Sequence, residues 1–189
     1  HEEAENLTLG LVWNPAALPD LVVTLDWFDI EIEGAIGNAG TQNIINLCYQ
    51  SPGFSSPYCD LIRGPAFVGE SPSGTSPFRN AAEDISGVDL TNGNFQVFNT
   101  SGVDFNVAWG FDVAAGRIDL DLAGTWLDTY EFQTVAGGPV LQYAGKFASD
   151  PYFGSPAAFP EWQGRLTAAF RRDDWGASWT TRYMDGVSD

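Results

Sequence analysis

Carboxylates are the commonest residues that could do chemistry in this sequence, and two pairs have a spacing that would suit catalysis. Asp119 and Asp121, and likewise Asp29 and Glu31, stand two residues apart, which puts both members of a pair on one face of a β-strand. Two carboxylates could serve a glycoside hydrolase as general acid and base. The chain holds 25 acidic residues, however, so such coincidences are expected, and a solvated acidic face is the simpler interpretation.

Other catalytic arrangements are missing from the sequence. The only histidine is His1, and there is no Gly-Lys phosphate loop, no His-Glu-x-x-His motif and no Gly-x-Ser-x-Gly turn. A Ser-His-Asp triad would have to recruit that terminal histidine. We therefore expect no catalytic residue and predict that the protein is not an enzyme.

Two cysteines, Cys48 and Cys59, lie in a segment rich in Gly, Pro and Ser. In an exported protein this arrangement predicts one disulfide that closes a short loop, and the alternative is two reduced thiols. A metal centre is disfavoured because the chain has no other cysteine and a single histidine. We expect no cofactor; the one alternative is Ca²⁺ bound by acidic external loops, for which no ordered Asp-x-Asp-x-Asp-Gly loop is present.

The composition is acidic and aromatic at once. A formal net charge of -17 and a pI near 4.1 argue against nucleic acid as a partner, because nucleic acid requires a basic surface. Aromatic residues make up 14% of the chain, which a disordered acidic tail would lack. Rings in such number need an apolar environment that covers them. No apolar run approaches the roughly 18 residues of a transmembrane helix, so a helical membrane protein is excluded.

Alternation of apolar and polar residues with period two recurs along the chain, and no long stretch shows the helical period of 3.6. The sequence therefore predicts an all-β fold, an antiparallel up-and-down meander of about six long strands. These strands are expected at residues 5–14, 21–33, 99–112, 116–133, 161–171 and 174–185. The alternation slips near residues 26–28, for which a β-bulge is one explanation.

The connections between the expected strands alternate between short and long. Three short connections, at residues 15–20, 112–116 and 172–174, contrast with two long ones, at about 34–98 and 133–161. Outer-membrane barrels combine tight periplasmic turns with long extracellular loops, whereas compact soluble domains rarely hold structureless loops above about 15 residues. The rhythm favours part of a large transmembrane β-barrel.

Each expected strand has one polar and one apolar face. On the polar faces we predict lumen-facing residues: Asp104, Asn106, Asp119, Asp121, Gln163, Arg165, Thr180 and Arg182. On the apolar faces we predict a lipid-facing aromatic girdle: Trp109, Trp126, Tyr130, Trp162, Trp175, Trp179 and Tyr183. The alternative is a soluble β-sandwich that binds carbohydrate, in which the same rings would fill a core between two sheets.

Several segments, taken in order, resemble the barrel of TonB-dependent outer-membrane receptors. They are residues 6–15 and 25–36, then Asn46–Tyr49 with Tyr58–Cys59 and Ile62–Arg63, which resemble a cysteine-bearing external loop, and finally residues 99–105, 125–130 and 175–189. The resemblance spans nearly the whole chain. It implies a barrel of about 22 strands in the Gram-negative outer membrane, which encloses a plug and imports a scarce nutrient under the drive of the TonB complex.

About six strands cannot close such a barrel, so we expect residues 1–189 to be an incomplete, C-terminal part of the barrel domain, without the plug domain. The resemblance implies these partners: outer-membrane lipid, the remaining strands and plug of the same receptor, the TonB complex through that plug, and a small-molecule nutrient.

The two long loops are expected to capture that nutrient, a carbohydrate or a metal chelate. They carry many aromatic rings and few cations, which favours a neutral or cationic ligand. The rings are those of Tyr49, Phe54, Tyr58, Phe67, Phe78, Tyr143, Phe147, Tyr152, Phe153 and Phe159.

Overall fold

A computed structural model describes residues 1–65, 70, 72, 76–90, 92–135, 138–148 and 157–188. The chain forms two compact units. The sheet unit comprises Ala4–Ile32, Phe98–Phe132 and Leu141–Asp189, and the loop unit comprises His1–Glu3, Glu33–Val97 and Gln133–Val140.

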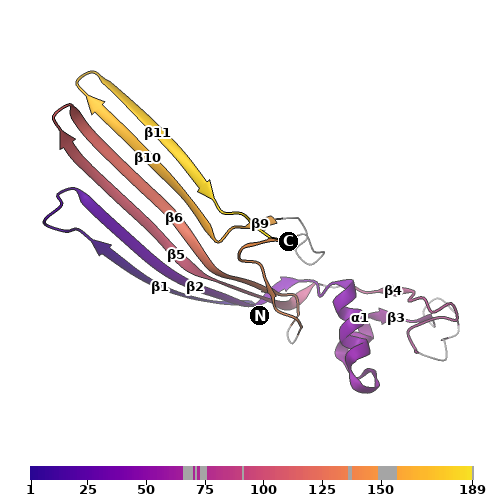
Figure 1. Ribbon diagram of the computed structural model, residues 1–189. Helices are drawn as coiled ribbons and strands as arrows, with labels where there is room; N and C mark the ends of the chain where they lie inside the picture. The colour runs from indigo at the N-terminus through magenta and orange to yellow at the C-terminus, as the bar shows by residue number, and fades with distance from the viewer. Residues whose placement is uncertain are drawn as a thin grey trace. The chain divides into compact units, whose positions relative to one another are not determined.

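Six long strands pair in chain order, β1-β2-β5-β6-β10-β11, and the short strand β7 also pairs with β6 (Figure 1). Their bounds are β1 Glu3–Trp13, β2 Leu21–Gly37, β5 Gly93–Val113, β6 Gly116–Gln133, β7 Leu141–Gln142, β10 Trp162–Arg172 and β11 Trp175–Met184. The predicted all-β antiparallel meander of about six long strands is confirmed. Among the described residues β1 and β11 each pair on one side only, so the sheet is open.

Three tight connections join the long strands into hairpins, and Figure 1 shows all three at the same end of the sheet. The first spans residues 14–20, where the Leu18 N–H donates to the Pro15 carbonyl at 3.1 Å. The second is residues 114–115, and the third is Asp173–Asp174, whose first residue has a φ of 46°. A positive φ at this place is what a two-residue hairpin requires, because the turn must follow the right-handed twist of its strands.

Strand β2 runs without a break through the place where the alternation slips. A side chain at Gly10 would meet the Asp26 carboxylate, and one at Gly102 would meet the Phe28 ring at 2.8 Å. Residues 26 and 28 thus share a face, as regular pleating demands. The irregularity in sequence arises because Phe28 occupies a polar face, where Gly102 leaves room for its ring.

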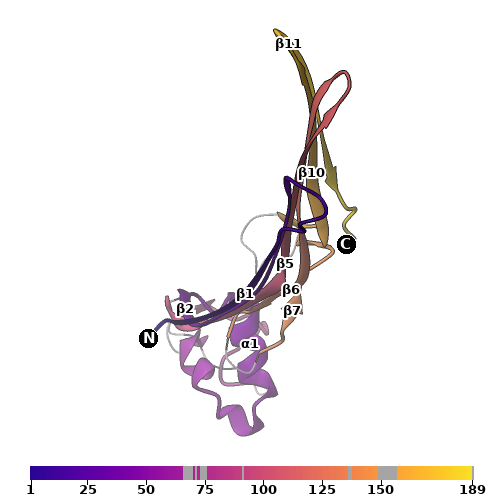
Figure 2. The ribbon, with the colours of Figure 1, turned by 90° about the vertical axis from the view of Figure 1, so that its left-hand side faces the viewer.

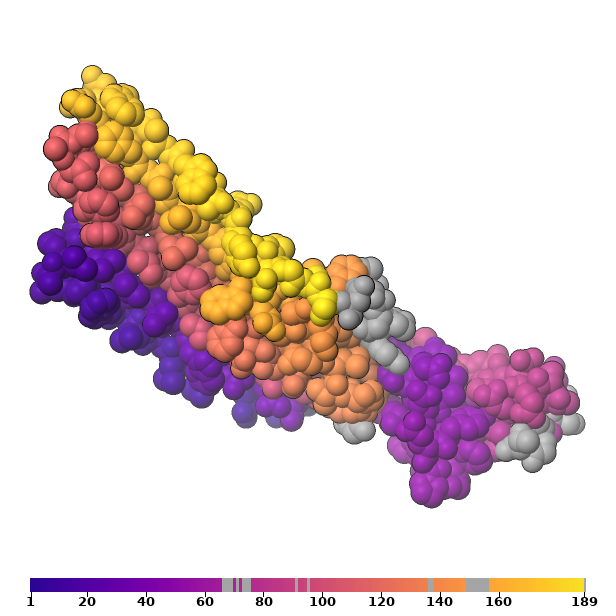
Figure 3. Space-filling view, viewed as in Figure 1, coloured from indigo at the N-terminus to yellow at the C-terminus, as the bar shows by residue number. Residues whose placement is uncertain are grey.

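The long sheet is a single layer. Figure 2 shows its strands nearly edge-on as one curved layer, and the face seen in Figure 3 carries no second layer of the sheet unit. The other described sheets are only two-stranded, β3 Ile62–Arg63 with β4 Gly87–Val88 and β8 Lys146–Ala148 with β9 Ala157–Phe159. A soluble sandwich would bury the apolar face under a second sheet; the described residues form no such sandwich.

The loop unit has its own small core, which the sequence pattern did not predict. It contains helix α1, Thr41–Gln50, and the 3-10 helices η1, Pro52–Phe54, and η2, Pro57–Leu61. The disulfide between Cys48 and Cys59 is confirmed, and it lies in a cluster of buried residues: Ala39, Ile44, Cys48, Cys59, Ile62 and Val135.

Helix α1 was not predicted from the sequence, in which no long stretch shows a helical period. This helix has only ten residues, and its N-cap, Gly40, makes no side-chain capping bond. So short a helix is marginal alone and depends on tertiary packing, here of Asn43, Ile44 and Cys48, which are buried. No helix among the described residues is long and apolar enough to cross a membrane.

Replacing both Cys48 and Cys59 by serine in the complete protein should destabilise the loop unit by about 3 kcal/mol, the chain-entropy value for a loop of this length. Hydrogen exchange measured by mass spectrometry should then be on the order of 100-fold faster in α1 and η2, while β10 and β11 keep their protection. The control is Ser55→Ala, an exposed position that leaves the disulfide intact. Unchanged exchange in α1 would contradict the structural role of the disulfide.

Substituting Gly124→Ala in the complete protein should destabilise the sheet by about 1–3 kcal/mol, the usual penalty of overpacking. A Cβ there would lie 2.5 Å from Cζ of Phe105 and 2.7 Å from the Gln163 carbonyl oxygen. Gly186→Ala is the matched control, because nothing lies within 4 Å of its Cβ position. Urea unfolding curves compare the two variants, and equal midpoints would refute the close approach at Gly124.

Candidate functional site

The strand register decides which predicted residues share a face of the sheet. Arg165 pairs with Arg182, and Thr167 pairs both with Thr180 on β11 and with Asp121 on β6. Directly opposed residues of an antiparallel pair point to the same side. The two-residue period then places all the lumen-facing candidates of β6, β10 and β11 on one surface, the polar face: Asp119, Asp121, Gln163, Arg165, Thr180 and Arg182.

Side-chain hydrogen bonds bring the two candidates of β5 onto the same polar face. Thr125 donates to the Asp104 carboxylate at 2.6 Å, and the Asn106 amide donates to Asp121 at 3.1 Å. Asp121 also accepts from the Arg165 guanidinium at 3.3 Å. The polar face is therefore a continuous surface across four strands rather than a set of isolated residues.

An ion-pair cluster occupies the turn end of the polar face. Asp119 is bound by both Arg117, at 3.2 Å, and Arg171, at 3.1 Å, and Arg117 also contacts Asp20 at 3.0 Å. Of this cluster, only Asp119 is predicted from the sequence as a lumen-facing residue. Arg117 and Arg171 share the parity of Asp119, which was the available signal, but nothing local connects them to Asp20, which lies 97 residues from Arg117.

The opposite surface, the apolar face, carries the predicted girdle. Trp126 and Trp162 are directly opposed, with ring centroids 6.0 Å apart. Trp175, Trp179 and Tyr183 follow one another at every fourth position of β11 and are 57–61% exposed. Trp109 belongs to the same face, and its ring lies 4.3 Å from that of Phe111.

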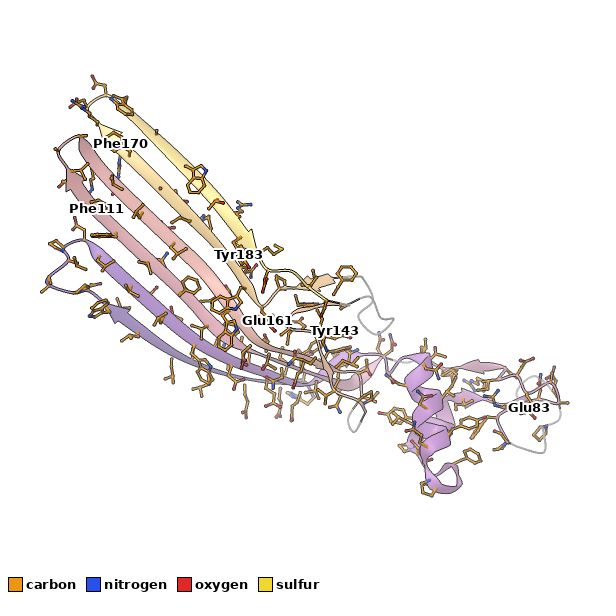
Figure 4. The ribbon with its side chains drawn as sticks, viewed as in Figure 1. Glu83, Phe111, Tyr143, Glu161, Phe170 and Tyr183 are labelled. Atoms are coloured by element: carbon orange, nitrogen blue, oxygen red, sulfur yellow. A yellow bond between two sulfur atoms is a disulfide. The ribbon has the colours of Figure 1, made fainter. Side chains whose placement is uncertain are left out.

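Aromatic rings gather toward both ends of the apolar face. Figure 4 shows Phe111 and Phe170 toward the turn end and Tyr183 toward the opposite end. Phe170 packs on Trp175 at 5.2 Å beside the third turn. Trp179 is the exception, since its partner in the register, Ala168, lies in the middle of β10.

Tyr130 and most described loop rings pack inside small clusters. Tyr130 stacks on Phe159 at 4.3 Å, and Tyr143 lies 5.9 Å from the same ring. In the loop unit Tyr49, Phe54 and Phe78 form a triangle with ring centroids 5.4–6.2 Å apart. These rings hold the loops together, and among the described loop rings Phe147, 38% exposed, is the most open.

Three loop rings of the predicted ligand platform, Phe67, Tyr152 and Phe153, lie outside the described residues. Within the described ranges, no group of three or more His, Cys, Asp or Glu side chains could hold a metal ion. Calcium binding by acidic loops stays a prediction.

A family model, TonB dependent receptor-like, beta-barrel, matches residues 2–189. No curated protein and no solved structure gives a significant match to the chain. The family match covers nearly the whole chain, and an antiparallel meander with one polar and one apolar face is the pattern that a transmembrane barrel wall requires. The chain belongs to the TonB-dependent receptor family, in its β-barrel domain.

Proposed function

We propose that residues 1–189 form part of the wall of an outer-membrane receptor that takes up a scarce nutrient, with the apolar face against lipid and the polar face toward the lumen. One observation carries this proposal: large apolar side chains are exposed on one face of a single sheet, and ion pairs join the side chains of the other face. Leu9 and Leu11 are 64% and 59% exposed on β1, and Trp179 is 60% exposed on β11. Water would disfavour so much contiguous apolar surface, whereas acyl chains match it.

The spacing of the rings supports a membrane position. Trp162 and Phe170 stand eight residues apart on one face of β10, which is about 27 Å of extended strand. At the usual tilt of a barrel strand this spans roughly 21 Å of bilayer, close to the apolar band of about 25 Å between aromatic girdles. The two ends of the apolar face would then meet the two lipid headgroup regions.

The positions of the short and long connections indicate how the sheet is oriented in the membrane. Tight turns of outer-membrane barrels face the periplasm, and long connections face outward. Accordingly the turns at 14–20, 114–115 and 173–174 would lie on the periplasmic side. Residues 34–98 and 133–161 would form extracellular loops that capture the nutrient, a carbohydrate or a metal chelate.

Transport of this kind needs no covalent step by the wall. The partners in the proposal are the plug and remaining strands of the same receptor, the TonB complex acting through the plug, and lipid. The contacts of Asp119 and Asp121 explain their spacing without catalysis. Asp119 is bound by two arginines, and Asp121 binds Arg165 and Asn106.

A pair of neighbouring threonines tests which face meets water. Thr180 bonds to Thr167 on the polar face, at 3.1 Å between hydroxyl oxygens, whereas Thr181 is opposite Leu166 on the apolar face. The test uses the complete receptor in native outer membranes and a membrane-impermeant maleimide that has access to the lumen. Thr180→Cys should react with this reagent, and Thr181→Cys should not. Cys48 and Cys59 are joined in a disulfide and do not contribute, and the receptor without an introduced cysteine gives the background labelling.

Each variant serves as control for the other, because residue type, strand and depth are matched. Unfolding in denaturant should make both thiols react equally. Equal labelling of the two positions in the folded protein, or labelling of Thr181→Cys alone, would reject the assigned faces.

A further inference from the structure

Two arginines stand directly opposite each other on the polar face. The register pairs Arg165 of β10 with Arg182 of β11, and both side chains are exposed. Like charges in directly opposed positions destabilise a strand pair, since their Cβ atoms are only about 5 Å apart. Such a pair is stable when an anion lies between or beside the two guanidinium groups.

The arginines of the polar face differ in how many carboxylates they contact. Arg117 and Arg171 each contact Asp119, and Arg165 contacts Asp121 at 3.3 Å. For Arg182, the part of the chain that the structure describes offers no carboxylate oxygen within 4 Å. Among the described residues Asp121 is thus the one carboxylate that pairs with the two opposed arginines, and it also accepts a bond from Asn106.

A hollow of about 580 Å³ lies beside this pair. Its lining includes three small residues, Ala123, Gly124 and Gly164, and the longer side chains of Gln163, Arg165 and Arg182, together with the rings of Phe105 and Tyr183. Ala123 is directly opposite Arg165 in the register, so its short side chain leaves room for a ligand group beside the Arg165 guanidinium.

The one carboxylate lining this hollow, Asp104, is badly placed to neutralise Arg182. It belongs to β5, three strands from β11 in the sheet order, which is about 14 Å at ordinary strand spacing. Solvent-exposed charges at that distance exceed a Debye length of about 8 Å and are largely screened. Asp104 is also already bonded to Thr125.

We propose that Arg165 and Arg182 together bind a carboxylate or phosphate group of a small molecule in the lumen. Guanidinium groups present planar forks of donors that match the paired oxygens of both anions, and the Gln163 amide lies one same-face position from Arg165 on β10. The inference rests on the proposed function, because it requires the polar face to line the lumen. The proposed pair would be an oxyanion-binding site in a protein whose net charge is strongly negative.

Citrate and inorganic phosphate are the probes for this site. Isothermal titration at low ionic strength, on the complete folded receptor in detergent, should show saturable binding of at least one of them, and the probe that binds identifies the oxyanion. Arg182→Gln and Arg165→Gln should each weaken that binding by roughly tenfold or more, the loss expected for a charge-assisted hydrogen bond. Arg172→Gln is the matched control, since Arg172 is opposite Trp175 on the apolar face and pairs with Asp173; it should leave the affinity unchanged.

Absence of saturable binding to the wild-type receptor, or equal affinity of wild type and Arg182→Gln, would overturn the proposal. If wild type binds neither probe and Arg182→Gln alone lowers the unfolding midpoint, Arg182 is paired with a carboxylate from elsewhere in the receptor, which also overturns it. The titration uses only receptor that has passed the Thr180 and Thr181 labelling test. Failure of that earlier test rejects the proposed function, whereas failure of titration alone rejects the anion site.

Discussion

The register of β6, β10 and β11 fixes which side chains share a face, and the chemistry of both faces depends on it. Period-two strands tolerate no slip, because a shift of one residue would move Trp126, Trp162 and Trp179 onto the polar side and Asp121 and Arg165 onto the apolar side. Tight turns help to fix this register. The two-residue connection Asp173–Asp174 leaves Arg172 opposite Trp175, and every pair up to Gln163 and Met184 follows from that start.

The two faces contribute differently to stability. Ion pairs on the polar face join partly exposed side chains, such as Arg165 and Asp121 with 52% and 40% of their side-chain surfaces exposed. Exposed pairs of this kind stabilise a protein by less than about 1 kcal/mol each, so they specify pairing and hold water-facing geometry more than they add stability. The backbone ladder and the environment of the apolar face must supply the rest, since a single layer has no second sheet against which to bury Leu9, Leu11 or Trp179.

Period-two alternation and turn residues predict the six long strands and the composition of each face, because both signals are local. Contacts between distant segments carry no such signal. The contact between Asp20 and Arg117 joins the first turn to the start of β6, and the packing of Phe28 against Gly102 depends on the pairing of β2 with β5. Helix α1 is missed for a related reason: it has only ten residues, and it depends on distant contacts, with Cys48 joined to Cys59 and Ile44 packed in the loop core.

The use of aromatic rings inside the loops changes where ligand selectivity must come from. A ring face that packs against another ring is not free to form a sugar platform. Tyr130 is stacked on Phe159, and Tyr49, Phe54 and Phe78 pack edge-on or tilted against one another. A high density of loop rings is therefore weak evidence for a neutral ligand, because rings are also what a short, disulfide-closed segment needs to build a core. Polar side chains without a charged partner are a better guide to the ligand. Among the described residues no carboxylate oxygen lies within 4 Å of the Arg182 guanidinium, and Arg182 is opposite Arg165, whose partner Asp121 also accepts a bond from Asn106.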